Sequence, residues 1–213
     1  FYDPFQYASA EANFNTVDIL NQLAETERKS EKIDIDPENI TKYLSEWSKK
    51  IGALSIGFTE LKEYHKYSNV GRGSEYGNEV EVNHKFAVAF TVEMDKEMVD
   101  MAPAGPIVME SAEKYLKIGT IAIQIAEFIR NLGYDARAHI DGNYRVVCPL
   151  VARDAGLGEL GRMGLLMTPE LGPRVRIAVV TTDLPLEVKK TKFDASIDYF
   201  CAFCKNLEWD ALV

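Results

Sequence analysis

A short glycine-rich stretch late in the chain carries the clearest signs of a ligand site. The sequence DAGLGELGRMG places Gly156, Gly158 and Gly161 before Arg162. Glycines let a backbone come close to a ligand, and an arginine guanidinium pairs with anionic groups. We therefore predict that this loop contacts an anionic ligand, with a plain tight turn as the alternative.

The same glycines match the GxGxxG pattern of dinucleotide-binding loops, but their surroundings argue against such a site. A dinucleotide loop directly follows a strand and opens a long helix. Here Pro149 interrupts the approach, and Thr168 and Pro169 stop any helix within two turns. A nicotinamide site is therefore a less favoured interpretation.

Two arginines stand two residues apart where a strand is expected to begin. In the sequence GPRVR, Arg174 and Arg176 fall on one face of an extended chain, because side chains alternate along a strand. If that face lines a pocket, the two guanidinium groups could receive a phosphate, a carboxylate or a developing anion. On an exposed face they would be ordinary surface charges.

Cysteines offer a second kind of chemistry. Cys201 and Cys204 form a CxxC pair, a spacing used in zinc, iron–sulfur and dithiol sites. Leu207 stands where the third cysteine of a CxxCxxC would lie, so this pair alone leaves a four-thiolate site incomplete. Cys148, between an apolar run and Pro149, is expected to be a buried structural cysteine.

Tyrosines are candidate proton donors. An arginine beside a tyrosine favours the phenolate and lowers the phenol pKa, which makes such a pair suitable for protonating a carbanion or radical. The alternative for each tyrosine is a core position with a hydrogen-bonded hydroxyl. The candidates are Tyr115, on the longest expected helix, and Tyr64, Tyr67, Tyr76, Tyr134 and Tyr144.

Other catalytic patterns are missing from the sequence. His65, His84 and His139 have no paired metal-ligand spacing, so we expect structural or surface roles for them. No GxSxG elbow and no Walker lysine loop is present, and hydrolase and nucleotide-hydrolysis functions therefore have no support.

Composition limits the class of protein further. With 213 residues, 46% of them hydrophobic, the chain can bury the core of one domain, and its net charge of −9 argues against nonspecific nucleic-acid binding. No apolar run of about 20 residues is present, and the first residues lack a signal-peptide pattern. We expect a soluble protein, cytoplasmic or exported and membrane-associated, that binds a small molecule and no nucleic acid.

Periodicity and turn signals predict alternating helices and strands around these residues. The first 35 residues are polar, with one short apolar helix face at Val17, Ile19, Leu20 and Leu23, and a long polar loop is expected over 62–83. Helices are expected over 36–52 and 107–132, and strands over 53–58, 85–93, 134–140, 144–148 and 175–182. The predicted fold class is α/β (α+β), with one mixed sheet flanked by helices.

Several of these motifs together resemble the corrinoid-dependent reductive dehalogenases and, more distantly, the epoxyqueuosine reductases. The resemblance covers roughly residues 40–204. It is carried by GALSIGFTEL, KFAVAFTVEMD, the MAPA at 101–104, AEFIRNLGYDA, DAGLGELGRMGLLMTPELGPRVR, TDLPL and the FCxxC at Phe200.

The resemblance implies a nitroreductase-like core that holds cobalamin in base-off form, followed by a segment with two [4Fe-4S] clusters that feed electrons to cobalt. Reduced cobalt would then cleave a carbon–halogen bond of a small organohalide. By the same resemblance Tyr115 donates a proton, assisted by Arg176, and Asn143 is a third catalytic residue, although DGNYRVVCPL departs from the family's NDxAxxxPL. The cofactor site is assigned to Gly156, Gly158, Gly161, Arg162 and Arg174, and metal binding to Cys201 and Cys204.

The resulting division has an N-terminal appendage at 1–35, a corrinoid-binding core at 36–200 and a remnant of an iron–sulfur segment at 201–213, as in a chain truncated at the first cysteine motif. A membrane-anchor protein, an electron donor and a second copy of the chain are candidate partners. A noncatalytic corrinoid-binding relative without clusters is the alternative, followed by a flavin or nicotinamide oxidoreductase.

Overall fold

The structure is a computed structural model that describes residues 3–189 and 196–210. The α-helices are α1 (Pro4–Leu20), α2 (Pro37–Lys50), α3 (Lys96–Asp100), α4 (Gly105–Asn131), α5 (Cys148–Asp154) and α6 (Ser196–Asp210), with short 3-10 turns at Asn21–Leu23 and Glu63–His65. The strands are β1 (Ser55–Glu60), β2 (Phe86–Glu93), β3 (Ala136–His139), β4 (Glu159–Leu160), β5 (Leu166–Met167) and β6 (Val175–Thr182).

Four of these strands form the central sheet, in the order β1-β2-β6-β3. β6 lies inside the sheet, as its apolar sequence predicted, and pairs with β2 through Phe90 opposite Ala178. The α+β class is confirmed. The predicted mixture of strand directions is wrong, because all three pairings in this sheet are antiparallel.

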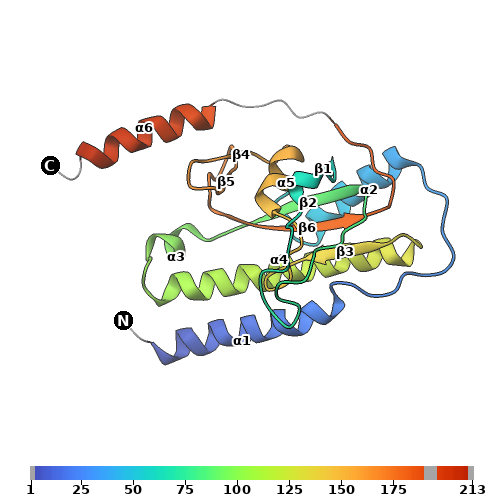
Figure 1. Cartoon of the computed structure of the whole chain (residues 1–213). Helices are drawn as coiled ribbons and strands as arrows, with labels where there is room; N and C mark the ends of the chain where they lie inside the picture. The colour runs from blue at the N-terminus through green and yellow to red at the C-terminus, as the bar shows by residue number, and fades with distance from the viewer. Residues whose placement is uncertain (1–2, 190–195, 211–213) are drawn as a thin grey trace.

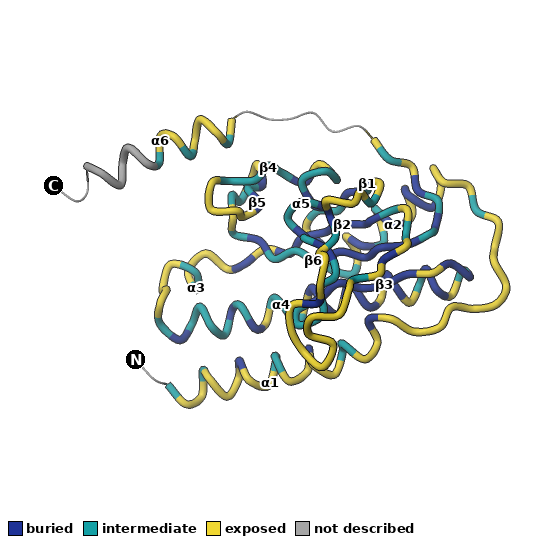
Figure 2. Tube along the Cα trace, viewed as in Figure 1, coloured by how far each residue is buried: buried dark blue, intermediate teal, exposed yellow. Residues whose placement is uncertain are grey.

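Alternation along β2 and β6 divides the core between two faces of the sheet. Val88 and Phe90 of β2 face α4 and α2, whereas Ala87 and Ala89 face α5. Figure 1 shows α4 along one face and α5 on the other, and Figure 2 shows that the strands between them are the most buried part of the chain. The sheet is therefore covered on both faces.

Helix α4 is the longest helix, as predicted, and it ends where the glycine signal predicted. Gly133 has φ +86°, a conformation that favours glycine, and a Cβ there would lie 2.2 Å from the carbonyl oxygen of Glu31. The N-terminal helix α1 packs along α4. Val17 is buried in that contact, but Ile19 and Leu23 are exposed, so the apolar face expected for this helix is only partly correct.

The segment 144–148 corrects another expectation. Its apolar residues predicted a strand, but only Val146 makes a bridge, to Lys66, and Cys148 begins helix α5. Pro149 occupies the first turn of that helix, where its missing N–H costs no helical hydrogen bond. None of the helices in residues 3–189 and 196–210 is both long enough and apolar enough to cross a membrane.

Candidate active site

Tyr115 and Arg176, predicted as a donor pair, lie against each other between α4 and β6. Arg176 projects from β6 toward α4, and its guanidinium carbon lies 4.5 Å from the centroid of the Tyr115 ring. The Nη2 group of Arg176 donates a hydrogen bond of 2.8 Å to the Ser111 hydroxyl. Ser111 and Tyr115 are four residues apart and so share one face of the helix. The positive charge is therefore held over the tyrosine ring by a second residue of the same helix.

An open cavity of about 220 Å³ adjoins this pair. Apolar side chains from the hairpin β4–β5 and from the start of β6 form much of its wall, among them Leu165, Leu166 and Val175. The polar groups in the wall are few. The full set of lining residues is Tyr67, Tyr115, Tyr144, Val146, Cys148, Pro149, Leu165, Leu166, Pro173, Val175, Arg176 and Ile177. A mostly apolar wall with a few convergent polar groups is typical of a small-molecule site.

Cys148 lies in the wall of this cavity, and it is buried, as its sequence context predicted. Burial raises the pKa of its thiol to about 12. The side chain is therefore a neutral thiol at pH 7 and neither a strong nucleophile nor a ready metal ligand. Its place in the cavity wall points to packing rather than covalent chemistry.

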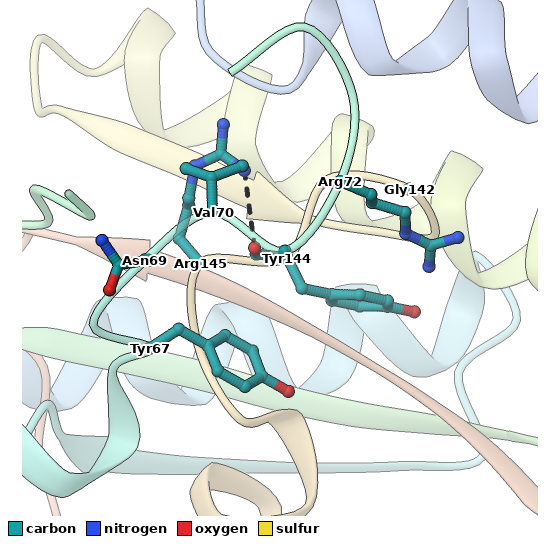
Figure 3. Close-up of a pocket in the computed structure, with 8 residues that line it drawn as sticks. Tyr67, Asn69, Val70, Arg72, Gly142, Tyr144 and Arg145 are labelled. Carbon is teal, nitrogen blue, oxygen red and sulfur yellow. Dashed lines mark hydrogen bonds between the residues drawn. The ribbon is translucent and has the colours of Figure 1, made fainter. Parts of the chain in front are cut away.

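A second cavity of about 280 Å³ adjoins the first, between the loop 62–83 and the turn after β3 (Figure 3). Tyr67 and Tyr144 line both cavities. The other side chains of the second cavity include Asn69, Arg72 and Arg145, so it is the more polar of the two. The long polar loop predicted from the sequence is thus part of a cavity wall.

The chain is similar in sequence to known reductive dehalogenases. The chain is 34% identical to a tetrachloroethene reductive dehalogenase of Desulfitobacterium hafniense over 179 residues, which are 84% of this chain and 31% of that protein. It is 38% identical over 122 residues to the tetrachloroethene reductive dehalogenase of Dehalobacter restrictus, 57% of this chain and 22% of that protein. Over most of its length, the chain is therefore homologous to part of the tetrachloroethene reductive dehalogenases. No protein-family profile matches it.

Solved reductive dehalogenase structures share the fold. The catabolic reductive dehalogenase NpRdhA superposes with a TM-score of 0.78 at 24% identity, covering 91% of this chain and 28% of that one. An epoxyqueuosine reductase of Streptococcus thermophilus has a TM-score of 0.50 at 16% identity over 74% of this chain and 50% of its own. The chain spans about a third or less of the length of the curated reductive dehalogenases that it matches.

Two other predicted site residues lie apart from the first cavity. The Asn143 side-chain oxygen accepts a 2.7 Å hydrogen bond from Arg137, and Asn143 is not among the lining residues. Arg174 pairs with Glu93 at 2.7 Å and also donates to the Met94 carbonyl. Its guanidinium holds the ends of β2 and β6 together, so Arg174 and Arg176 do not act as the joint anion site that their spacing suggested.

The glycine stretch also takes a different form from a ligand loop. Gly156 follows α5 with φ +82°, and Gly158 and Gly161 lie around the hairpin β4–β5. A Cβ on Gly158 would lie 2.2 Å from the Met167 carbonyl oxygen, so this glycine allows a close contact within the hairpin. Arg162 is exposed at the hairpin. These glycines lead into the hairpin β4–β5 and not directly into a helix, which agrees with the sequence argument against a dinucleotide loop.

Cys201 and Cys204 lie on α6 as free, half-buried thiols. A Cβ on Gly161 would be 3.7 Å from the Cys201 sulfur, which places this part of α6 beside the hairpin. Within residues 3–189 and 196–210, no group of three or more His, Cys, Asp or Glu side chains is arranged to hold a metal ion. The described residues therefore offer two thiolates where a [4Fe-4S] cluster needs four ligands.

Sequence reasoning missed Ser111 at the site and a polar cluster around Asp154 whose members line neither cavity. Ser111 carried no motif, although its position four residues before Tyr115 on an expected helix could have indicated a shared face. The cluster is centred on Asp154, whose carboxylate binds Lys62 at 2.9 Å and the His65 Nε2 at 3.1 Å. These partners are about 90 residues away in the chain, and no local pattern connects them.

Proposed function

We propose that this chain is the corrinoid-binding core of a reductive dehalogenase and that its site acts on a small organohalide. The observation that carries the proposal is the Tyr115–Arg176 pair in the wall of an open, mostly apolar cavity. The sequence identity to tetrachloroethene reductive dehalogenases supports it, and one solved relative is described in terms of B12-dependent dehalogenation. The division into an appendage at 1–35, a core at 36–200 and an iron–sulfur segment from 201 is part of the same proposal.

The described residues at the cavity offer groups that a bound corrinoid could contact, but they do not offer the ligand set of an iron–sulfur cluster. The Nε atom of Arg176 is buried and has no hydrogen-bond partner among the described residues, so a donor remains for a bound group. The hairpin β4–β5, which carries Leu165 and Leu166, provides apolar surface at the same cavity. The two thiolates of Cys201 and Cys204 do not complete a cluster site, and we assign no step to one.

Replacement of a halogen by hydrogen consumes two electrons and one proton and releases halide. Bound corrinoid would supply the reduced cobalt that breaks the carbon–halogen bond. The Tyr115 hydroxyl would supply the proton, as a positioned general acid. Arg176 lies against the tyrosine ring, so its charge would stabilise the phenolate that remains after the proton has left.

We propose that the corrinoid is contacted by residues from the group Gly156, Gly158, Gly161, Arg162 and Arg174. Of these, Arg162 has the most suitable position, because it is exposed on the hairpin whose neighbouring residues line the cavity. Arg174 is already engaged by Glu93 and the Met94 carbonyl, so a direct role for it would require that pair to open. Asn143 would likewise have to leave Arg137 to reach the cavity.

Turnover tests the activity. The purified chain is reconstituted with cobalamin without oxygen, a titanium(III) reductant supplies electrons directly, and chloride release from tetrachloroethene is measured. Corrinoid-dependent chloride release above that of free cobalamin supports the proposal. Rates equal to those of free cobalamin would reject the dehalogenase assignment, and tight corrinoid binding without turnover would favour a noncatalytic binding protein.

A further inference from the structure

Tyr67 and Tyr144 stand between the two adjoining cavities. Both residues line the first cavity together with Tyr115 and Arg176 (the inner cavity), and both line the second cavity together with Arg72 and Arg145 (the outer cavity). Figure 3 shows the two tyrosine rings projecting toward the same side from two neighbouring chain segments. The two side chains therefore form a shared wall, on one side of which lies the candidate catalytic pair.

Backbone hydrogen bonds hold the two segments together. The N–H of Tyr67 donates to the Arg145 carbonyl at 3.1 Å, and the N–H of Val147 donates to the His65 carbonyl at 2.7 Å. These bonds fix the loop 62–83 to the chain that follows β3. The backbone that carries the two rings is therefore held in place on both sides of the wall.

Two ion pairs also join these two segments. Arg72 of the loop binds Asp141 of the turn at 3.0 Å. Arg145 binds Glu75, which lies near the far end of the loop. Each pair joins the loop to the segment that carries Tyr144. Ion pairs as well as backbone hydrogen bonds therefore hold the two segments together.

The chemistry of the wall suits a neutral halogenated ligand. Burial raises the pKa of Tyr67, with a further contribution from Cys148. Burial also raises the pKa of Tyr144 far above the usual range of a phenol, and the nearby Cys148 and Tyr115 add to that shift. Both phenols are thus uncharged at neutral pH, and each presents an aromatic ring and one hydroxyl donor.

The volume of the inner cavity limits the size of a ligand that it can enclose. Its volume of about 220 Å³ is below the range of about 300–1,000 Å³ that is usual for drug-sized ligands. The two cavities joined would fall within that range. A ligand beside Tyr115 and Arg176 can thus extend into the outer cavity only past the wall between the two cavities.

We propose that Tyr67 and Tyr144 limit substrate length on the side of the outer cavity, by keeping ligands longer than a single substituted ring or a haloalkene from extending past the two rings. The proposal rests on the proposed function, since it takes the inner cavity as the place where the organohalide binds. It predicts that removal of either ring joins the cavities and admits a longer ligand.

Ligand binding to the chain without corrinoid tests this proposal. Dissociation constants are measured by ligand-observed NMR for 4-bromophenol and for 4-bromo-4′-hydroxybiphenyl. The unsubstituted chain should bind the single ring at least about tenfold more tightly than the biphenyl. In Tyr144→Ala and Tyr67→Ala this preference should fall to about one or reverse, whereas Tyr144→Phe should keep it, because the ring remains.

The test uses Tyr67→Ala and Tyr144→Ala, with Tyr76→Ala as the control. Tyr67 is 44% exposed, so Tyr67→Ala should fold even if Tyr144→Ala does not. Tyr76→Ala removes an exposed tyrosine of the same loop that lines neither cavity, and it should leave the preference unchanged. An unchanged preference in folded Tyr67→Ala, or no binding of either ligand to the unsubstituted chain, would overturn the proposal. Because the assay contains no corrinoid, these results are independent of failure to bind cobalamin.

Discussion

The Arg176 guanidinium makes two contacts with the same helix, a 2.8 Å hydrogen bond to the Ser111 hydroxyl and a face-on contact with the Tyr115 ring. One residue of β6 is thus fixed to two residues of α4 that lie one turn apart. The strand and the helix are packed through the buried core, so the pair is set by the fold itself. This arrangement leads to the first two predictions.

Tyr115→Phe should retain cobalamin binding and lower chloride release from tetrachloroethene by about 100-fold or more, because a positioned general acid contributes about that factor. The ring and its contact with Arg176 remain, so the fold should be unchanged. Chloride release under titanium(III) reduction measures the effect. Tyr43→Phe, at an exposed tyrosine of α2, is the matched control. Equal rates for Tyr115→Phe and the unsubstituted chain would assign the proton to another donor.

Ser111→Ala should lower turnover less than Arg176→Lys, because the guanidinium remains and only its anchor is lost. A lysine ammonium keeps the charge, but it lacks the planar guanidinium that stacks on the ring and donates to Ser111 at the same time. The expected loss for Ser111→Ala is in kcat, with little change in KM, since the serine acts through Arg176. Ser9→Ala removes an exposed hydroxyl of α1 and serves as the control. A change in KM alone would mean that Ser111 contacts the substrate directly.

All three histidines should make folding stability fall as the pH is lowered from 7.5 to 5.5. Burial lowers the pKa of His65, His84 and His139 in the folded chain, most strongly at His139, where Arg137 adds to the effect. Below about pH 6.5 the unfolded chain takes up protons that the folded chain excludes. Stability is therefore fully present above that pH and declines below it, by at most about 1.4 kcal/mol per pH unit for each histidine.

Urea unfolding at several pH values measures this dependence. His139→Gln stays neutral across the range, so its stability should depend less steeply on pH, even if its stability at pH 7.5 is lower. The unsubstituted chain at the same pH values is the reference. If the free energy of unfolding depends on pH equally steeply in His139→Gln and in the unsubstituted chain, then His139 does not exclude a proton in the folded state.

Asp154→Asn should destabilise the chain by about 1–3 kcal/mol, because several donors lose a charged acceptor. Burial alone would raise the pKa of Asp154, but hydrogen bonds from Tyr64, Lys62 and Arg153 outweigh it and hold the pKa well below the usual value. That stability is present above about pH 4 and is lost as the pH falls further. Thermal unfolding at pH 7 measures the loss.

A matched control for the Asp154 variant is Glu63→Gln. Glu63 is almost fully exposed and pairs with Lys66 on the surface, so its loss should change stability by less than about 1 kcal/mol. Similar losses in the two variants would contradict a special role for the cluster around Asp154.

Gly158→Ala should destabilise the hairpin β4–β5, since the added Cβ would lie 2.2 Å from the Met167 carbonyl oxygen and backbone would have to move. Gly71→Ala, where a Cβ meets nothing within 4 Å, should be tolerated. Protease cleavage near the hairpin and the unfolding midpoint compare the two variants. Equal stability would show that the hairpin adjusts without cost.

Local sequence patterns predicted the helices and strands whose composition or boundary residues are distinctive. The helix α4 was expected because its apolar run stops at Gly133, and β6 was expected because VRIAVVTT is apolar enough to lie inside a sheet. Tyr115 and Arg176 were paired only through the resemblance. Their contact depends on how α4 crosses β6, which residue spacing does not determine.

Other features could not be found in the sequence for physical reasons. The apolar run at 144–148 has the composition of a strand, but it pairs with the loop only at Val146 and then enters helix α5. The spacing of Arg174 and Arg176 placed both on one face, but Arg174 precedes β6 and turns to Glu93. In both cases a contact between distant segments overrides the local pattern.

The absorption spectrum of cobalamin added to the purified chain under reducing conditions tests the central claim most directly. We predict saturable binding at tens of micromolar or below, with the base-off spectrum expected from the resemblance, and weaker binding after Arg162→Ala than after Arg28→Ala at the distant, exposed surface. A spectrum that stays that of free cobalamin at these concentrations would contradict the assignment of this chain as a corrinoid-binding core.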